Sequence, residues 1–237
     1  MAHETVLILP DGAAEPTGSR ETPFGPAPVF DQQQGPLILI RAEGTDPRAL
    51  IYAAKEAGAR RVLAAETAAP VSHLLEPGDL VVPEDVIDLT RLRPFTFFVG
   101  KGYGFIKLNP PFCPDLMAWC LEVARRQNPR SFARAVYVGV EGPRDPTPAE
   151  LRMYRQWGGD LAGTGLLPEV YLARELELCY AAVVAVGNDP NSAAMVLQEV
   201  AAVYRPGRTP CRCGETMRDL RKQGVVGEDW REWIAYP

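Results

Sequence analysis

The hydrophobic positions of this chain fall mainly into short continuous runs rather than a strict alternation. The clearest runs lie at residues 6–9, 37–41, 62–65 and 179–186. Short apolar runs bounded by turn residues are typical of strands that are buried on both faces of a parallel sheet. Helical patterns separate several of these runs, which indicates βαβ units with right-handed crossovers. The pattern predicts an α/β fold with a largely parallel central sheet.

Capping signals mark where the predicted helices begin. Asp46 precedes a proline and is expected to cap a helix that ends near residue 58. A capping box with proline at the first helical position lies at 147–150, and a third helix is expected to follow Asp189 as far as residue 204. Further helices are predicted over 114–126 and from residue 168 onward.

The remaining segments are assigned with fewer signals. Strands are expected near 80–83, 86–88, 95–99, 136–140 and 161–162. Residues 14–35 are predicted to form a long surface loop with at most one strand near Val29. The glycine-rich run at 100–104 is interpreted as a flexible loop, because no Lys-Ser/Thr pair opens a helix after it, with phosphate binding as the alternative. We expect one domain over residues 1–237, in which 205–237 form a C-terminal helical extension.

Composition excludes several classes of protein. The net charge is −5 and no basic stripe appears, which argues against nucleic-acid binding. No apolar run approaches the roughly 20 residues that span a bilayer, and the N-terminus lacks a secretory pattern, so no membrane partner is expected. Five cysteines, an odd number, indicate reduced thiols and a cytoplasmic location.

Residues 141–181 combine glycine-bearing turns with predicted strand ends and two helix starts. In α/β sheets, ligands bind where strand ends meet such turns. We therefore expect a small-molecule site along this stretch.

Eight short motifs follow one another in order between residues 22 and 189. They are TPFGP at 22–26, PGDLV at 77–81, IDLT at 87–90, PFCP at 111–114, EGPR at 141–144, WG at 157–158, PE followed by ARE at 168–175, and CYA at 179–181. By these motifs the chain resembles the methylthioadenosine phosphorylase branch of the purine nucleoside phosphorylase family. The resemblance implies a central mixed, largely parallel sheet flanked by helices. It also implies a small-molecule nucleoside as substrate, a homotrimer or a multiple of trimers, phosphate as co-substrate, and no cofactor.

The resemblance also implies which residues surround the phosphate. Asp11 stands where the family has a hydroxyl after the first strand, and Arg41 stands at the phosphate arginine. The family's threonine on the next strand aligns with Glu66, or with Thr67 if one residue is skipped. Two carboxylates at about 4 Å from a phosphate dianion would each oppose it by about 4 kcal/mol at an effective dielectric near 20, and one arginine offsets about one of them.

Other positions are implied for the nucleoside. The family's second phosphate threonine aligns with Gly165, and the methionine beneath the sugar aligns with Thr164. The aromatic wall of the base aligns with Asp145. A histidine that family members contribute across a subunit contact aligns with Phe105.

Asn188 and Asp189 replace the residues with which the family reads the base. Asn188 is the candidate for purine recognition, as in 6-oxopurine-specific relatives, since its amide both donates and accepts hydrogen bonds. Asp189 is a catalytic candidate whose structural interpretation is a helix N-cap. Glu141 and Arg144 are interpreted as a pair or as loop anchors, and Glu169 as a first-turn residue placed against the helix dipole.

Three functional hypotheses remain open from these residues. The first is phosphorolysis of a purine nucleoside in salvage. The second is a nucleoside hydrolase in which Asp11, Glu66 and Asp145 activate water, and the third is a non-catalytic ligand-binding paralogue. No metal is expected, because the pair Cys211-x-Cys213 has no second pair in the sequence; it forms either a short-loop disulfide or two thiols.

Overall fold

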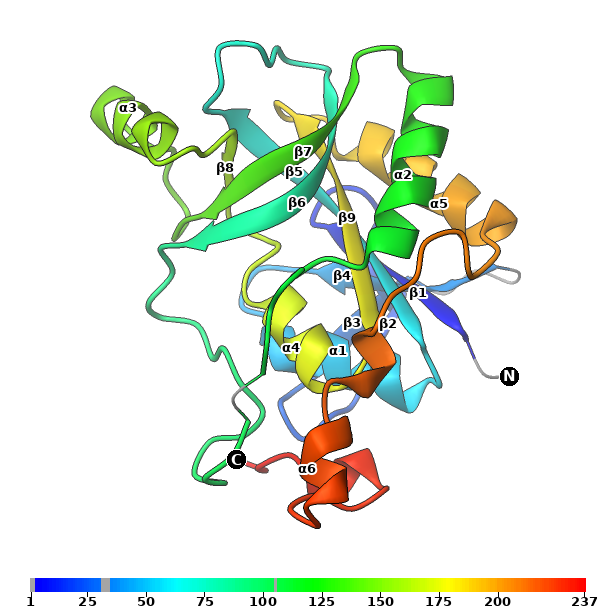
Figure 1. Cartoon of the computed structure of the whole chain (residues 1–237). Coiled ribbons are helices and arrows are strands. Elements are labelled where there is room, and N and C mark those ends of the chain that lie inside the picture. Colours follow the sequence, from blue (N-terminus) through cyan, green and yellow to red (C-terminus); the bar gives the residue numbers. More distant parts are fainter. Residues whose placement is uncertain (1–2, 31–34, 105) are drawn as a thin grey trace.

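A mixed sheet runs through the computed structural model, which describes residues 3–30, 35–104 and 106–237 (Figure 1). Within these residues its strands are β1 (Thr5–Pro10), β2 (Gly18–Arg20), β3 (Ala27–Phe30), β4 (Leu37–Arg41), β5 (Arg61–Pro70), β6 (Leu80–Asp88), β7 (Ser131–Gly139), β8 (Leu161–Gly163) and β9 (Cys179–Val186).

The strand order brings the sheet back onto itself. The order is β2-β3-β4-β1-β5-β8-β7-β6-β9, and β5 also pairs with β9. Parallel pairing joins β1 to β4 and β5, β5 to β9, and β7 to both β6 and β8. The strands from β5 to β9 therefore form a closed ring, and the predicted mixed α/β sheet is confirmed.

Helices cover the sheet, and their starts follow the capping signals. The helices are α1 (Pro47–Glu56), α2 (Pro114–Gln127), α3 (Pro148–Gln156), α4 (Glu169–Glu175), α5 (Pro190–Val203) and α6 (Arg218–Lys222). Asp46 accepts a hydrogen bond from the amide of Arg48 at 2.8 Å, and Thr147 forms the expected capping box with Glu150. Within the described residues, no helix combines the length and apolar character that crossing a bilayer requires.

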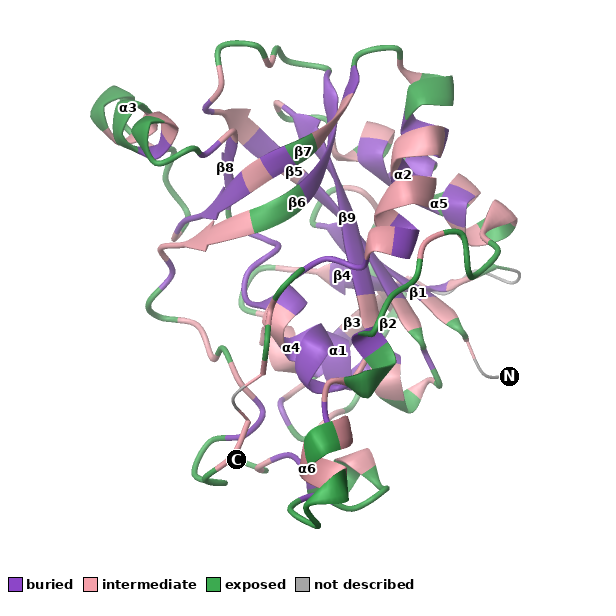
Figure 2. Cartoon of the chain, in the orientation of Figure 1, coloured by how far each residue is buried: buried purple, intermediate pink, exposed green. Residues whose placement is uncertain are grey.

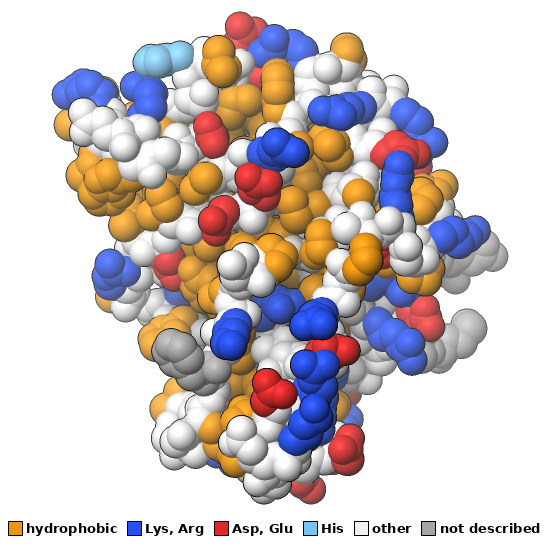
Figure 3. All heavy atoms as spheres, viewed as in Figure 1, with side chains coloured by type: hydrophobic (Ala, Val, Ile, Leu, Met, Phe, Trp, Pro, Cys, Tyr) orange, Lys and Arg blue, Asp and Glu red, His pale blue; other side chains and the backbone are white. Residues whose placement is uncertain are grey.

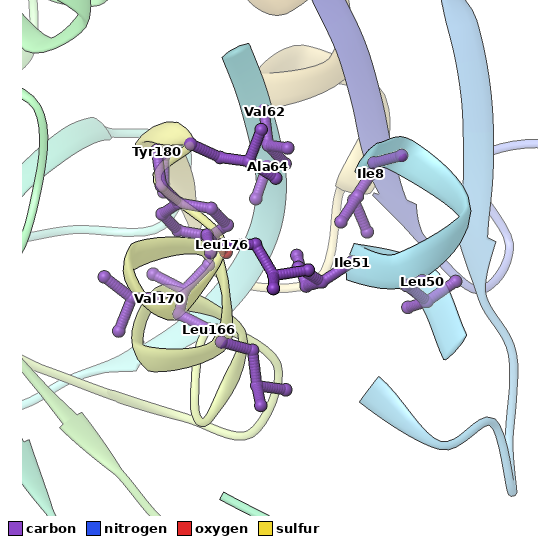
Figure 4. Packing of buried hydrophobic residues seen from close by; sticks show 14 of the residues in the cluster. Ile8, Leu50, Ile51, Val62, Ala64, Leu166, Val170, Leu176 and Tyr180 are labelled. Atoms are coloured by element: carbon purple, nitrogen blue, oxygen red, sulfur yellow. The ribbon is translucent and has the colours of Figure 1, made fainter. Parts of the chain in front are cut away.

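The continuous apolar runs are explained by burial on both faces of the sheet (Figure 2). In β1, Val6 and Ile8 point into the core under α1 and α4, while Leu7 and Leu9 point into the core under α2 and α5. Figure 4 shows the first of these cores, where Ile51 of α1 and side chains of α4 meet the sheet.

Three local expectations were wrong. The loop predicted over 14–35 contains two strands, β2 and β3, which pair as a hairpin against β4. The segments 80–83 and 86–88 belong to one strand, β6, that pairs through an irregularity at Pro83. Residues 95–99 form no strand. There the backbone of Phe97 is bound from two sides: its amide donates to Glu175 Oε2 at 2.7 Å, and its carbonyl accepts from Ala235.

The last residues of the chain return across the α4 side of the molecule. Met217, Trp233 and Ile234 are buried in the core under α1 and α4. Arg221 forms an ion pair with Glu177 at 2.8 Å. In Figure 3, basic and acidic side chains lie intermixed over the lower part of this face, where α6 lies. This C-terminal segment therefore contributes to the main core.

The carboxyl group of Glu175 makes the stability of this arrangement depend on pH. Burial raises the pKa of Glu175 to about 7, above about 4.3 in an unfolded chain. Its contribution is fully present below about pH 4.3 and is lost as the pH rises through about 7. This group should lower the free energy of unfolding by about 3 kcal/mol between pH 4 and pH 8.

Chemical denaturation across that pH range tests this prediction. Glu175→Gln should remove the decrease. Glu150→Gln should retain it, because the pKa of Glu150 is lowered to about 2 by Arg144 and its titration ends below this range. The same decrease in the Glu175→Gln protein would contradict the assignment.

Candidate active site

Two adjoining hollows lie where several strands end. The larger has a volume of about 760 Å³, and its lining includes Asp11, Arg41, Glu43, Arg93, Thr164, Gly165 and Glu169. The smaller has a volume of about 330 Å³ and is lined in part by Glu66, Thr67, Asp145, Thr164 and Asn188. Thr164 lines both hollows, so a ligand that extends across this residue would reach both.

Arg41, the last residue of β4, is held by a carboxylate that lies 128 positions later in the chain. Its Nε and Nη2 donate to the two oxygens of Glu169 at 2.7 and 2.9 Å. Glu169 is 1% exposed and also accepts a hydrogen bond from the hydroxyl of Tyr180 at 2.8 Å. Such bidentate pairing fixes the plane of the guanidinium group. Arg41 therefore presents its remaining nitrogen, Nη1, in a defined direction.

On that remaining side, Nη1 donates to the carbonyl of Ala65 at 3.2 Å and to Glu66. Its Oε2 lies 3.3 Å from Arg41 Nη1, and its Oε1 accepts from the amide of Thr67 at 2.9 Å. A Cβ atom at Gly165 would lie 1.6 Å from Glu66 Oε2 and 2.8 Å from Arg41 Nη1. Any other residue at 165 would displace this carboxyl group, so Glu66 and Gly165 fit each other as a pair.

Burial and neighbouring charges shift the titration of this cluster. Burial alone lowers the pKa of Arg41, but the carboxylates of Glu169 and Glu66 raise it above its usual value. Burial raises the pKa of Glu66, against the opposing effect of Arg41. Because Glu169 pairs with Arg41 in closer geometry than Glu66 does, burial outweighs the effect of Arg41 on the pKa of Glu66.

Arg93 holds the turns around the larger hollow. Its side chain pairs with Glu141 at 3.1 Å and donates to the carbonyls of Thr164 and Leu167, the latter at 2.8 Å. Glu141 in turn accepts from the amides of Arg91 and Leu92. These contacts fix the Thr164 turn between the two hollows.

The structure brings most of the predicted site residues to the hollows. Asp11 and Arg41 line the larger one, and Asp145 and Asn188 line the smaller one. Asp189 instead accepts from the amide of Asn191 at 3.0 Å and caps α5. Phe105 lies outside the described residues.

The structure decides between the two interpretations of Glu141 and Arg144 and corrects that of Glu169. Glu141 and Arg144 do not pair with each other but anchor their loops: Glu141 pairs with Arg93, and Arg144 pairs with Glu150 at 2.6 Å. Glu169 begins α4 as expected, but its carboxylate serves Arg41 rather than the helix terminus. The sequence carries a signal for this role, since a glutamate between apolar residues in a buried helix needs a cationic partner.

The sequence argument against a cysteine cluster is also wrong. The chain folds so that Cys113, Cys179, Cys211 and Cys213 lie together, outside both hollows. The missing second pair of thiols comes from two residues that are 66 positions apart in the sequence.

Comparison with known proteins agrees with this architecture. The family model described as the phosphorylase superfamily matches residues 17–205. The chain belongs to this superfamily. A relative from Moorella thermoacetica named "Probable 6-oxopurine nucleoside phosphorylase" is 34% identical over 223 residues, which are 87% of this chain and 84% of the relative. The S-methyl-5'-thioadenosine phosphorylase of Thermofilum pendens is 33% identical over 188 residues, 73% of this chain and 72% of the relative.

A solved structure shows the same fold at lower identity. The methylthioadenosine phosphorylase sourced from an antarctic soil metagenomic library superimposes with a TM-score of 0.80 at 22% identity. The match covers 98% of this chain and 97% of that chain. The nucleoside-phosphorylase-like fold expected from the motifs is therefore confirmed.

The ion pair between Arg41 and Glu169 should dominate the stability of the site. Glu169→Ala leaves a buried guanidinium with only Glu66 beside it, and breaking a buried pair costs about 3–5 kcal/mol. Tyr180→Phe, which removes one hydrogen bond from the same carboxylate, should cost about 1 kcal/mol. Urea denaturation of both variants measures the difference, and equal losses would contradict a dominant role of the ion pair.

Proposed function

We propose that this protein is a purine nucleoside phosphorylase that cleaves the N-glycosidic bond of a purine or methylthiopurine nucleoside with phosphate, in nucleoside salvage. The observation that carries the proposal is the position of Arg41, which Glu169 holds at the end of β4. Arg41 lines one hollow and Asn188 lines the adjoining one, in a chain that belongs to the phosphorylase superfamily. The relatives named as nucleoside and methylthioadenosine phosphorylases support the same reaction class.

We expect the phosphate and the parts of the nucleoside to occupy different positions in the two hollows. Phosphate binds at Arg41 and Thr67, where a guanidinium group and a backbone amide face the same point. The sugar passes Thr164, which lines both hollows, and the purine lies toward Asn188. The amide of Asn188 donates and accepts, so it can bind both O6 and a protonated N7 of a 6-oxopurine. Asp11 and Asp145 lie at the openings, next to solvent.

Charge development during the reaction explains why these groups are needed. The sugar becomes positive as the bond to the purine breaks, and the leaving purine becomes negative. A bound phosphate stabilises the cationic sugar and then attacks it, while a donor at the purine stabilises the leaving group. Phosphate is the co-substrate, and this reaction uses no cofactor.

Glu66 determines when phosphate can enter this site. In its ionised form it occupies the donors of Arg41 and Thr67 and repels a phosphate dianion by about 4 kcal/mol at 4 Å and a dielectric near 20. In its protonated form the repulsion disappears, and the carboxyl group donates a hydrogen bond as a threonine hydroxyl would. Burial raises the pKa of Glu66 and favours this neutral form.

We propose further that the chain assembles as a homotrimer and acts in the cytoplasm. Leu92, Phe95 and Val99 expose 87%, 65% and 64% of their surface on the segment that follows β6 beside the larger hollow. Exposed apolar side chains of this size are typical of surfaces that a partner covers. Light scattering on a size-exclusion column measures the mass of the assembly.

The activity is tested with purified protein and four nucleosides: methylthioinosine, methylthioadenosine, inosine and adenosine. Chromatography should detect free purine together with a sugar 1-phosphate, only when phosphate is present, and 6-oxopurine substrates should react with the higher kcat/KM. Absence of purine release from all four substrates would contradict the proposal. Release without phosphate would instead support hydrolysis by water.

The role of Glu66 gives a separate prediction. Glu66→Gln keeps the shape of the side chain but cannot ionise, so the KM for phosphate at pH 8 should fall at least about tenfold, which corresponds to about 1.4 kcal/mol. In the wild type, the KM for phosphate should rise with pH as Glu66 ionises. Phosphate itself also titrates, and this contribution to KM is the same for both proteins. The part of the rise that is due to Glu66 should therefore be absent from Glu66→Gln.

Glu43→Gln is the matched control, because Glu43 is exposed and lines the adjoining larger hollow together with Arg41, and the substitution removes the same charge. It should change the KM for phosphate less than about threefold, since exposed charges interact weakly. Equal effects of both substitutions would indicate a general change of charge rather than a contact between Glu66 and phosphate.

A further inference from the structure

Four cysteine sulfurs meet on the side of the molecule where the C-terminal segment joins the core. Cys113 precedes α2, Cys179 begins β9, and Cys211 and Cys213 lie in the segment after α5. All four Sγ atoms lie within 4.8 Å of one another, and those of Cys179 and Cys211 are 3.8 Å apart. Three separate parts of the chain therefore converge on one point.

The spacing of these sulfurs matches tetrahedral thiolate coordination. A Zn–S bond of about 2.3 Å gives sulfur–sulfur edges of about 3.8 Å in a regular tetrahedron. A disulfide requires about 2.05 Å. The one-residue spacer between Cys211 and Cys213 is shorter than the two to four residues of common zinc ligand pairs. In this chain, however, the fold has already brought the two sulfurs of that pair beside Cys113 and Cys179.

We propose that Cys113, Cys179, Cys211 and Cys213 bind one Zn²⁺ ion, which joins the C-terminal segment to α2 and β9. Zn²⁺ with four thiolates is a closed structural site that leaves no position for a substrate. Binding releases the thiol protons that the metal replaces, so no oxidant or reductant is needed. This proposal does not rest on the proposed function.

The start of a long helix adjoins the cluster. Cys113 is the N-cap residue of α2, a helix of 14 residues, and its side chain makes no capping hydrogen bond. The positive end of the helix dipole favours negative charge at such a position. One of the four proposed ligands therefore lies where a metal-bound thiolate would be stabilised.

Arg174 supplies a second, independent observation. It is 7% exposed, and its buried Nε has no hydrogen-bond partner among the described residues. A buried N–H group without a hydrogen-bond partner is costly. A zinc ion with four thiolates carries a net charge of −2, and Arg174 is close enough to interact with Cys213. The metal site would therefore place negative charge near this guanidinium group.

The proposed ion would link the C-terminal segment to the core. Beyond Cys213, this segment buries Met217 and Trp233 in the main core and, through Ala235, binds the carbonyl of Phe97. On the other side of the cluster, Cys179 adjoins Tyr180, which holds the carboxylate that orients Arg41. Loss of metal should loosen the segment.

Cys120 provides a matched control. It is fully buried in α2, does not belong to the cluster, and burial raises its pKa to about 12. Cys120→Ser therefore removes one thiol from the chain without touching the proposed ligands. Cys211→Ser removes an exposed ligand and is the substitution that disturbs packing least.

The full chain is produced with zinc in the medium, purified under reductant, and analysed by inductively coupled plasma mass spectrometry. We expect about one zinc per chain in the wild type and in Cys120→Ser, and at least a tenfold lower content in Cys211→Ser. Cobalt substituted for zinc should give the strong visible absorption of tetrahedral thiolate coordination in the first two proteins only. Stripping zinc with a chelator should lower Tm by about 5 °C or more.

Two results would overturn the proposal. One is less than about one zinc per ten chains in the reduced wild type, together with no thiolate-to-cobalt absorption. The other is equal zinc content in the wild type and in Cys211→Ser. If alkylation under denaturing conditions shows that four of the five cysteines are oxidised in pairs despite the reductant, the cluster is a pair of disulfides and the metal site is rejected.

Discussion

The buried ion pair between Arg41 and Glu169 is the constraint on which the site depends. A guanidinium group that is mostly removed from water must be paired, and here the pairing is bidentate with a carboxylate that is almost fully buried. It joins the end of β4 to the start of α4. The turns that line the two hollows lie next to this ion pair, and Arg93 donates hydrogen bonds to two of their carbonyls, those of Thr164 and Leu167.

Glu66 and Gly165 show how a site can change within a retained scaffold. Because residue 165 has no side chain, the carboxyl group of Glu66 can occupy the space next to which a Cβ atom would lie. The same carboxyl group uses the donors at which we propose that phosphate binds. In the proposed reaction, phosphate binding at Arg41 is therefore linked to the protonation of Glu66, and a hydroxyl residue at this position would not give the site this sensitivity to pH.

The cysteine cluster extends this dependence beyond the hollows. Cys179 and Tyr180 are neighbours on β9, and their side chains point to opposite faces of the sheet, as alternation along a strand requires. Cys179 lies in the cysteine cluster with Cys211 and Cys213 of the C-terminal segment, and Tyr180 donates a hydrogen bond to Glu169. Stability of the segment and orientation of Arg41 are thus connected through a single strand. Cys179 is half-buried and the rest of β9 is buried, so this connection runs through the packed core.

The sequence by itself determined the strands with continuous apolar runs, the caps and the family, because those runs, Asp46 and the 147–150 capping box are local signals, and the ordered motifs are specific. It also indicated Arg41, Glu66 and Asn188 by position. Only the tertiary structure decided their partners. Glu169 meets Arg41 across 128 residues, and Cys113 meets Cys213 across 100, because the sheet closes on itself. The 95–99 segment failed as a strand for the same reason: its backbone partners, Glu175 and Ala235, are distant in sequence and cannot be inferred from local pattern.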